Sequence, residues 1–396
     1  MGARIGDRGL LPELDAASYL AYCAVAPPSA PVLGAARRAL SDYARQGLGA
    51  VAPWLEERRT LRARLAALVG AASPDDIGLT SGTTAGIVAL AQCLPWRSGD
   101  ALVVLRGEFP TNVTPWLQAA RRHGLDVRWL ETEDFRPGGS GLERLSAALA
   151  DGRVRLVATS AVQFQTGLAM PLAAMAEAAH ARGALLFVDA IQAAGVVPID
   201  VRTAGIDLLA CGAHKWIGAL EGAGFVYVAP EHVARLEPNV AGWLSHEDPV
   251  SFLFGGPGLL RYDRPIRGGI DFVEGGSAST VGFAALSAAV ELLLELGVEG
   301  IARHVAAFHD RVAPDLVALG FVDGRTPEPE GRSGILALRP PEDLDLGAFR
   351  AGLAARGVVV TAPDGWLRIG PHWCTPLSEA GLVAEAASEV CRALRG

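Results

Sequence analysis

The chain has few cysteines, no long uninterrupted hydrophobic run and no excess of positive charge, and each absence excludes a class of protein. Its five cysteines are scattered and contain no CxxC pair, so we expect neither a disulfide framework nor a metal site, and a reducing cytoplasmic location fits. No stretch reaches the roughly 20 apolar residues that span a bilayer, and the first 15 residues lack the apolar core of a signal peptide. We therefore expect no membrane partner.

Charge and motif content argue against a nucleic-acid partner. Lys and Arg number 35 against 43 Asp and Glu, a formal net charge of −8, so no basic face is indicated. We find no internal repeat. With 396 residues, half of them hydrophobic, two domains with sizeable cores are expected. The partner should be a small molecule.

Apolar strands alternate with alanine-rich helical stretches along the first half of the chain. Strand, helix and strand joined by short turns are typical of a mainly parallel sheet covered on both faces. From about residue 230 to 269 the chain is rich in Gly, Pro and aromatic residues, which predicts a long functional loop region. Residues 280–319 then predict helices. The strands of the sheet are expected near residues 101, 154, 185, 207 and 224, with further strands at 334–340 and 357–362.

These elements predict an α/β fold with two domains. We place a large domain, built on the mainly parallel sheet, at residues 16–285. A smaller C-terminal α+β domain is expected at residues 286–396, together with the N-terminal segment 1–15.

Three short motifs carry the chemistry. Lys215 follows His214 in the run CGAHKW, 26 positions after Asp189, which closes the apolar run LLFV. Earlier, Thr83 and Thr84 lie in SGTTAG, between a strand-like and a helix-like segment. Alone, each motif has an ordinary interpretation: a helix N-cap for the threonines, a turn residue for the aspartate and a solvated pair for His-Lys. Their order and spacing together favour a cofactor site.

Pyridoxal 5'-phosphate (PLP) needs what these motifs offer. This flat pyridine carries an aldehyde, a phenolic oxygen and a phosphate, so its site must supply an amine, an anion opposite the ring nitrogen and a phosphate cradle. Lys215 can supply the amine as a Schiff base. Asp189, at the carboxyl end of a strand, can keep the ring nitrogen protonated. Backbone N–H groups at a helix start beside Thr83 and Thr84 can bind the phosphate.

The motifs resemble those of the fold-type-I PLP enzymes of aminotransferase class V, which include cysteine desulfurases and isopenicillin N epimerase-like proteins. The resemblance covers most of the chain, from YLAYCAVAPP near residue 19 to RIGPHWCT near residue 374. It implies that Lys215 forms the Schiff base and that Asp189 pairs with the pyridine nitrogen. It also implies that Gln192 approaches the phenolic oxygen. Thr83 and Thr84 would hold the phosphate, with His214 at its edge.

The resemblance implies four further contacts. Arg368 in WLRIGPH would receive the substrate α-carboxylate, where a planar guanidinium makes a paired contact. Gln163 in SAVQFQTG would face the phenolic oxygen, although Gln165 is left open as the residue that points inward. Ser277 in GGSAST would reach the phosphate of a neighbouring subunit, which implies a homodimer. Phe109 or Pro110 in EFPTNV would cover the ring, where desulfurases place a histidine.

Departures from the desulfurase pattern point to a different reaction. Desulfurases carry a nucleophilic cysteine on the loop before the carboxylate-binding arginine, but GVVVTAPDGWL has none, so persulfide formation there is not expected. The HKW motif and the later GAGFVYV favour the epimerase-like branch. Cys374 is interpreted as a packing thiol, and His372 is left open as an acid or base near Arg368 or as a hydrogen-bonded loop histidine.

These residues predict a PLP enzyme that acts on a small or medium α-amino acid through a Cα carbanion, with the freed Lys215 as base. We expect Cβ elimination, as in a C–S lyase, or epimerisation, ahead of transamination. Two alternatives of other classes are a non-catalytic PLP-binding protein and a dinucleotide-binding enzyme, although SGTTAG lacks the GxGxxG fingerprint.

Overall fold

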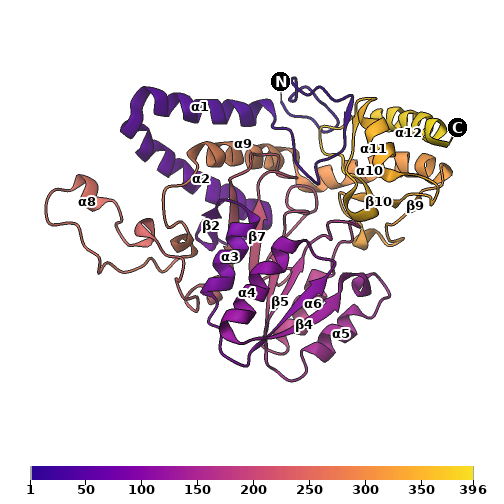
Figure 1. Cartoon of the computed structure of the whole chain (residues 1–396). Helices are drawn as coiled ribbons and strands as arrows, with labels where there is room; N and C mark the ends of the chain where they lie inside the picture. Colours follow the sequence, from indigo (N-terminus) through magenta and orange to yellow (C-terminus); the bar gives the residue numbers. More distant parts are fainter. Residues whose placement is uncertain (1, 396) are drawn as a thin grey trace.

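A computed structural model describes residues 2–395 and contains a central sheet of seven strands (Figure 1). Its strand order is β2-β8-β7-β6-β5-β3-β4. All neighbouring pairs from β7 to β4 are parallel, and only β8 runs antiparallel to both of its neighbours. The predicted α/β fold with a mainly parallel sheet is confirmed. The strands are β2 (Ile77–Thr80), β3 (Ala101–Arg106), β4 (Asp126–Glu131), β5 (Val154–Ser160), β6 (Leu185–Asp189), β7 (Leu208–Gly212) and β8 (Gly224–Val228).

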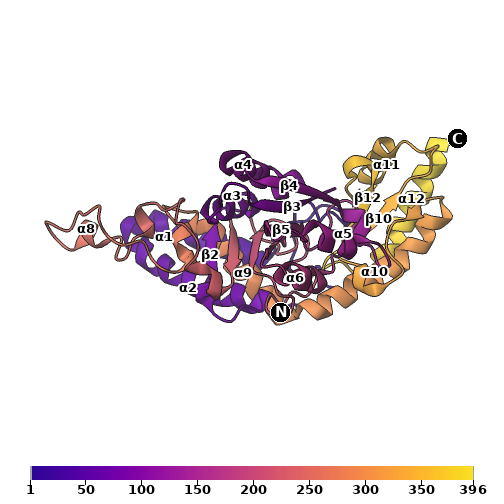
Figure 2. The same cartoon turned by 90° about the horizontal axis from the view of Figure 1, so that it is seen from below.

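The central strands are apolar on both sides because helices cover both faces of the sheet (Figure 2). Successive residues of a strand point to opposite faces, so Leu102 and Val104 enter one hydrophobic core while Val103 and Leu105 enter another. The first core lies under α3 (Thr83–Cys93) and α4 (Thr114–His123). The other packs against α2 (Val51–Val69), α5 (Gly141–Ala148), α6 (Leu172–His180) and α9 (Thr280–Leu296).

A second, smaller antiparallel sheet has the order β12-β10-β9 and its own core. That core is built from residues 308–391 and Leu20, whereas Ile5, Leu10 and Leu14 of the N-terminal segment pack against the larger core. The division at residues 285 and 286 stays a prediction. The elements of this part are α10 (Val298–Ala318), β9 (Val322–Asp323), β10 (Leu336–Arg339), α11 (Leu346–Ala354), β11 (Val358–Val359), β12 (Leu367–Ile369) and α12 (Glu379–Arg395), and β11 pairs with β1 (Ser18–Tyr19).

Residues 242–279 form an arm that extends away from the body of the molecule and carries α8 (Ser251–Phe254) (Figure 1). Its base is anchored, because the Glu274 carboxylate accepts hydrogen bonds from Leu79 N at 3.0 Å and from the Arg62 guanidinium at 2.6 Å. Its outer part exposes several large apolar side chains. The remaining helices are α1 (Ala30–Gln46), α7 (Pro230–Val233) and short 3₁₀ turns at Gly47–Ala50, Pro74–Asp76, Pro110–Asn112, Thr132–Phe135, Trp243–Ser245, Ile270–Val273, Pro329–Gly331 and Pro363–Gly365.

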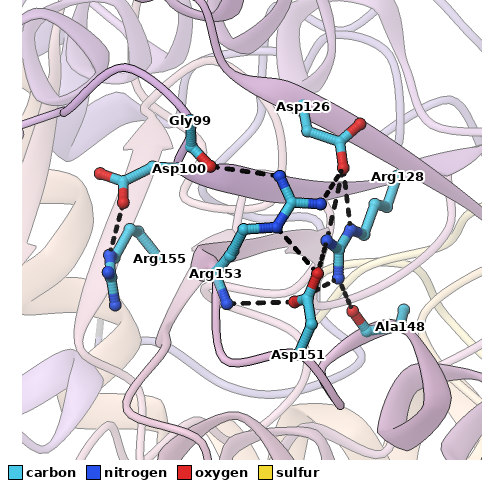
Figure 3. A network of polar contacts seen from close by, with 8 residues as sticks. All are labelled: Gly99, Asp100, Asp126, Arg128, Ala148, Asp151, Arg153 and Arg155. Carbon is cyan, nitrogen blue, oxygen red and sulfur yellow. Dashed lines mark hydrogen bonds and ion pairs between the residues drawn. The ribbon is translucent and has the colours of Figure 1, made fainter.

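A network of arginines and aspartates joins the amino-terminal ends of β3, β4 and β5 (Figure 3). Arg128 and Arg153 both contact Asp126 and Asp151, and these pairs hold the pKa of the Asp151 carboxyl below its usual value. The groups are largely solvent-exposed, so their contribution to stability is small. Polar groups that lie deeper are found at the opposite, carboxyl-terminal edge of the sheet.

Among residues 2–395, no single helix has the length and apolar composition needed to cross a membrane. Only α9 and α10 taken together pass that test, and they meet at a bend of 78°.

Candidate active site

A cavity of about 820 Å³ opens at the carboxyl-terminal edge of the central sheet. This edge is where ligands bind in open parallel α/β sheets. Asp189 ends β6, Lys215 follows β7, and the turn at Gly82 follows β2, so three separate strands bring these motifs together. Arg368, on β12 of the smaller sheet, also lines the cavity. The lining comprises Cys23, Ala24, Ser81, Gly82, Thr83, Thr84, Ala85, Phe109, Thr111, Phe164, Asp189, Ile191, Gln192, His214, Lys215, Glu221, Gly222, Pro363 and Arg368.

Asp189 and Lys215 form a pair of opposite charges in the cavity floor. Asp189 is buried and accepts a hydrogen bond from Ile191 N at 2.9 Å. Burial raises the pKa of Asp189 to about 6, against the lowering effect of the Ile191 N–H group and the Lys215 charge. Burial also lowers the pKa of Lys215, while the charge of Asp189 opposes this shift. The arrangement places an amine of lowered pKa and a carboxyl group in the same cavity.

The turn before α3 has the features of an anion seat. Gly82 has φ of 146° and no side chain caps the helix start. The Thr83 hydroxyl oxygen is buried and has no hydrogen-bond partner within residues 2–395. A Cβ added at Gly212 would lie 2.9 Å from this oxygen, so the glycine keeps the space around it open. A bound phosphate fits here, since it would receive the unpaired helix N–H groups and the Thr83 hydroxyl.

The Arg368 guanidinium is buried and held from two sides. Its Nε donates to Thr361 Oγ1 at 3.0 Å, and its Nη1 donates to the Phe164 carbonyl. No acceptor within residues 2–395 pairs with Nη2, and the side chain borders the cavity. A fixed guanidinium with one free edge can receive a carboxylate.

Thr84 and His214 lie where their motifs indicated, on the cavity wall. The Thr84 hydroxyl hydrogen-bonds with the Thr111 hydroxyl at 2.7 Å. Burial and the neighbouring Lys215 charge lower the pKa of His214. Its imidazole is therefore largely neutral at pH 7.

Gln192 also lines the cavity, but its amide is engaged by the protein. Its Nε2 donates to the Cys23 carbonyl at 3.0 Å, and its Oε1 accepts from the Trp216 indole at 2.9 Å. These bonds fix the segment that carries Lys215, since Trp216 is the next residue and is fully buried. A contact between Gln192 and the phenolic oxygen stays a prediction.

The structure does not bring Gln163 or Gln165 into the lining of the cavity. Gln163 is buried, and backbone groups occupy its side-chain amide. Its Nε2 donates to the Gly107 carbonyl at 2.6 Å, and its Oε1 accepts from Thr166 N at 2.6 Å. Gln165 instead donates to Asp364 Oδ2 at 2.6 Å and links the two sheets at the surface. The predicted role of Gln163 at the cofactor remains untested.

An aromatic pair forms one wall. Phe109 and Phe164 meet edge to face, with ring centroids 5.3 Å apart, and Lys215 Nζ lies 5.6 Å from the Phe109 centroid. Of the two residues expected to cover the ring, Phe109 borders the cavity and Pro110 does not. Sequence reasoning missed Phe164, Cys23 and Glu221, although Phe164 and Cys23 lie in the segments SAVQFQTG and YLAYCAVAPP, because only the folded chain shows which side chains of a segment face the cavity.

Cys374 and His372 lie outside the cavity. The buried Cys374 thiol is 2.8 Å from the Tyr22 hydroxyl, and burial raises its pKa to about 12. His372 Nδ1 accepts from Trp373 N at 2.8 Å, so the proton on Nε2 is donated to the Trp216 carbonyl at 2.6 Å. Burial lowers the pKa of His372 to about 4. Both side chains thus have structural contacts and reach no substrate space.

Ser277 is exposed on the arm, outside the cavity of its own chain. This position leaves it free for a second molecule to contact.

The sheet, the lysine and aspartate at its carboxyl edge, the anion seat at α3 and the family described below define a fold-type-I PLP enzyme, and PLP is its cofactor. The chain belongs to the aminotransferase class-V family, whose model matches residues 19–392. Members of this family that resemble it include enzymes of different reaction types.

A cysteine desulfurase of Dickeya dadantii is 31% identical over 322 residues, covering 80% of this chain and 72% of the relative. Isopenicillin N epimerase of Streptomyces clavuligerus is 28% identical over 334 residues, with 82% of each chain covered. Among solved structures, C-DES, a cystine C–S lyase, was seen with glycine covalently linked to its PLP cofactor; it has a TM-score of 0.84 at 21% identity, covering 96% of this chain and 99% of C-DES. At that identity the likeness establishes the fold alone.

Proposed function

We propose that this PLP enzyme is a lyase that removes a leaving group, most simply a thiol, from Cβ of a small or medium α-amino acid. Lys215 carries the proposal, because it is the amine that lines the cavity and burial lowers its pKa. A lowered pKa leaves more of the neutral amine, which can accept a proton from Cα at neutral pH.

Other side chains divide the remaining tasks. Asp189 faces the ring nitrogen, Thr83 and Thr84 with the start of α3 hold the phosphate, and His214 lies at the phosphate's edge. Arg368 receives the α-carboxylate, and Phe109 covers the ring. This assignment rests on the placement of these residues around one cavity and on the resemblance of their motifs to the family.

When bound, PLP withdraws electrons from Cα and thereby stabilises negative charge there. Lys215 Nζ takes the Cα proton while Arg368 holds the carboxylate in place. The Cβ–sulfur bond then breaks, and its electron pair leaves with the sulfur, which gains a proton as a thiol. Water hydrolyses the released enamine to a 2-keto acid and ammonia. These steps need one base, whereas inversion at Cα needs a second proton carrier on the opposite face.

Epimerisation is the second candidate, because Cys23 supplies a thiol in the cavity wall as a possible second proton carrier. Its Sγ lies 3.6 Å from Thr361 Oγ1, beside the Arg368 contact. Transamination would use the same residues as elimination, but it leaves the Cβ substituent in place and removes the amino group without releasing ammonia.

The test is a panel of amino acids that includes cysteine, cystine and S-substituted cysteines, each incubated with the PLP-loaded protein. Elimination predicts equal amounts of 2-keto acid, ammonia and thiol, and Lys215→Ala should abolish all three. Cys23→Ala, which removes only a wall thiol, is the matched control and should retain them. Inversion with Cα deuterium exchange, or keto acid without ammonia, would instead assign the protein as an epimerase or an aminotransferase.

We also propose that the protein is a homodimer in which the arm contributes Ser277 to the phosphate seat of the partner subunit. The support is the exposed position of Ser277 and the apolar side chains on the same arm.

A further inference from the structure

A second carboxylate, that of Glu108, lies at the end of β5, outside the cavity lining. Glu108 follows β3, one residue after the turn at Gly107. Part of the residue reaches the surface, but its carboxylate is enclosed by protein and points toward the end of β5. It has no arginine or lysine partner among residues 2–395, so its charge is not neutralised by a salt bridge.

One residue connects Glu108 to Asp189. The Glu108 carboxylate accepts hydrogen bonds from Ser160 N at 2.6 Å and from Ser160 Oγ at 2.9 Å. Ser160 is the register partner of Asp189 on the neighbouring strand β6, and Ala161 N donates to the Asp189 carbonyl at 2.8 Å. The ends of β3, β5 and β6 therefore hold two carboxylates on either side of a single serine.

The two carboxylates interact electrostatically. Burial is the main cause that raises the pKa of Glu108 to about 7, and the charge of Asp189 raises it further, against the effect of the Ser160 hydrogen bonds. The pKa of Asp189 is shifted mainly by burial, the Ile191 N–H group and the Lys215 charge, and an ionised Glu108 adds a weaker effect that favours a proton on Asp189 or on the group that shares a proton with it.

We propose that Glu108 is a positioning residue that acts through Asp189. Its negative charge stabilises the proton that the Asp189 carboxylate and the pyridine nitrogen of the cofactor would share. This inference rests on the proposed function, in which Asp189 faces that nitrogen. Glu108 touches neither cofactor nor substrate. Its effect is the electrostatic field of a second negative charge in an enclosed site, where charge interactions are stronger than in water.

The test compares PLP with 1-deaza-PLP, in which a carbon replaces the ring nitrogen, by measuring the dissociation constant of each with the full-length apo-protein. At about pH 8, where Glu108 with its pKa of about 7 is mostly ionised, Glu108→Gln should weaken PLP binding by roughly tenfold, as expected for a nearby buried charge. It should leave binding of the deaza analogue unchanged. Glu108→Asp, which retains the charge, should restore most of the PLP affinity.

Asp189→Asn serves as the positive control and should weaken PLP binding but not binding of the analogue. Equal weakening of both ligands by Glu108→Gln, or no weakening of either, would overturn the role of Glu108 alone. If the unmodified protein binds the two ligands equally well, the contact between Asp189 and the ring nitrogen is absent, and both the site assignment and this inference are overturned. Thermal unfolding of each apo variant verifies that it is folded, and if Glu108→Gln does not fold, Glu108→Ala, which also removes the charge, carries the same comparison.

Discussion

Three hydrogen bonds join Arg368 and Thr361 across the turn that precedes β12, the longest from Thr361 N to the Arg368 carbonyl at 3.4 Å. The Arg368 guanidinium donates to the Thr361 hydroxyl at 3.0 Å, and Arg368 N donates to the Thr361 carbonyl at 2.8 Å. Asp364 between them adopts a left-handed conformation with φ of 48°, which a non-glycine residue adopts only when its surroundings hold it. The turn is thus a rigid support for the arginine, and no cysteine lies in it.

Replacing Arg368 by Met should raise KM about 30-fold or more, because a charge-assisted contact with the substrate carboxylate contributes about 2 kcal/mol or more. Thr361→Val should give a smaller rise, since it loses only one of the bonds that orient the guanidinium. Steady-state kinetics measures both effects. Cofactor absorbance serves as the control and should not change, and a KM unaltered in Arg368→Met would remove Arg368 from the substrate site.

Lys215 is the only lysine in the chain, a feature that makes its chemistry unusually easy to follow. Borohydride reduction of the PLP-loaded protein should attach the cofactor to one peptide, the one that contains Lys215, as measured by mass spectrometry. Lys215→Ala should lose the visible absorbance band and the modification together. Attachment at the N-terminal amine, or no attachment in a saturated protein, would contradict the assigned role.

Asp189→Asn should change how the stability of the apo-protein depends on pH. The pKa of Asp189 rises from 3.8 to about 6 in the folded protein, so the folded state holds the proton more tightly than the unfolded chain. The stability therefore falls as pH rises through that interval, by up to about 3 kcal/mol for this group, and asparagine lacks this dependence. Denaturant unfolding should show that, between about pH 4 and pH 8, the free energy of unfolding of Asp189→Asn rises by about that amount relative to the unmodified protein. If the free energies of the two proteins changed with pH in the same way, the pKa shift of Asp189 would be contradicted.

Much of the site could be predicted because its chemistry lies in short contiguous motifs at strand ends. Asp189, Lys215 and Thr83 needed only the alternation of strands and turns to be placed together. Cys23, Phe164 and Glu221 could not be predicted, because their position depends on how β1 pairs with β11 and how distant loops meet. Gln163 shows a different limit: the resemblance predicts a contact with the cofactor, which stays a prediction, whereas the sequence did not indicate that its side chain hydrogen-bonds to the backbone of Gly107 and Thr166.

The cysteines offer a test of the sulfur chemistry. Cys374 is buried against Tyr22, so Cys374→Ser should cost about 1 to 3 kcal/mol of stability without changing kcat.

Cys23→Ala should retain thiol release, since elimination needs no enzyme thiol. A persulfide found on Cys23 after turnover, together with loss of activity in Cys23→Ala, would show that sulfur is transferred to the protein instead.

The arm should bind a second copy of the chain through its exposed apolar side chains. Phe254 is 63% exposed and Tyr262 is 88% exposed, while the base of the arm is fixed at Glu274. Apolar side chains grouped on a protruding segment are typical of an interface. Replacing both Phe254 and Tyr262 by Ser should shift the protein from dimer toward monomer in sedimentation analysis, and an unchanged mass would contradict their role.

A mixed dimer tests whether Ser277 reaches the partner subunit. Neither Lys215→Ala nor Ser277→Tyr should be active alone, the first because it lacks the amine and the second because a bulky ring would enter the phosphate seat. In a dimer of the two variants, one of the two sites would combine an intact Lys215 with an intact Ser277 from the other chain. Co-expression should therefore restore activity and PLP binding to that site. If Ser277 served its own chain, both sites of the mixed dimer would remain defective, and no activity would return.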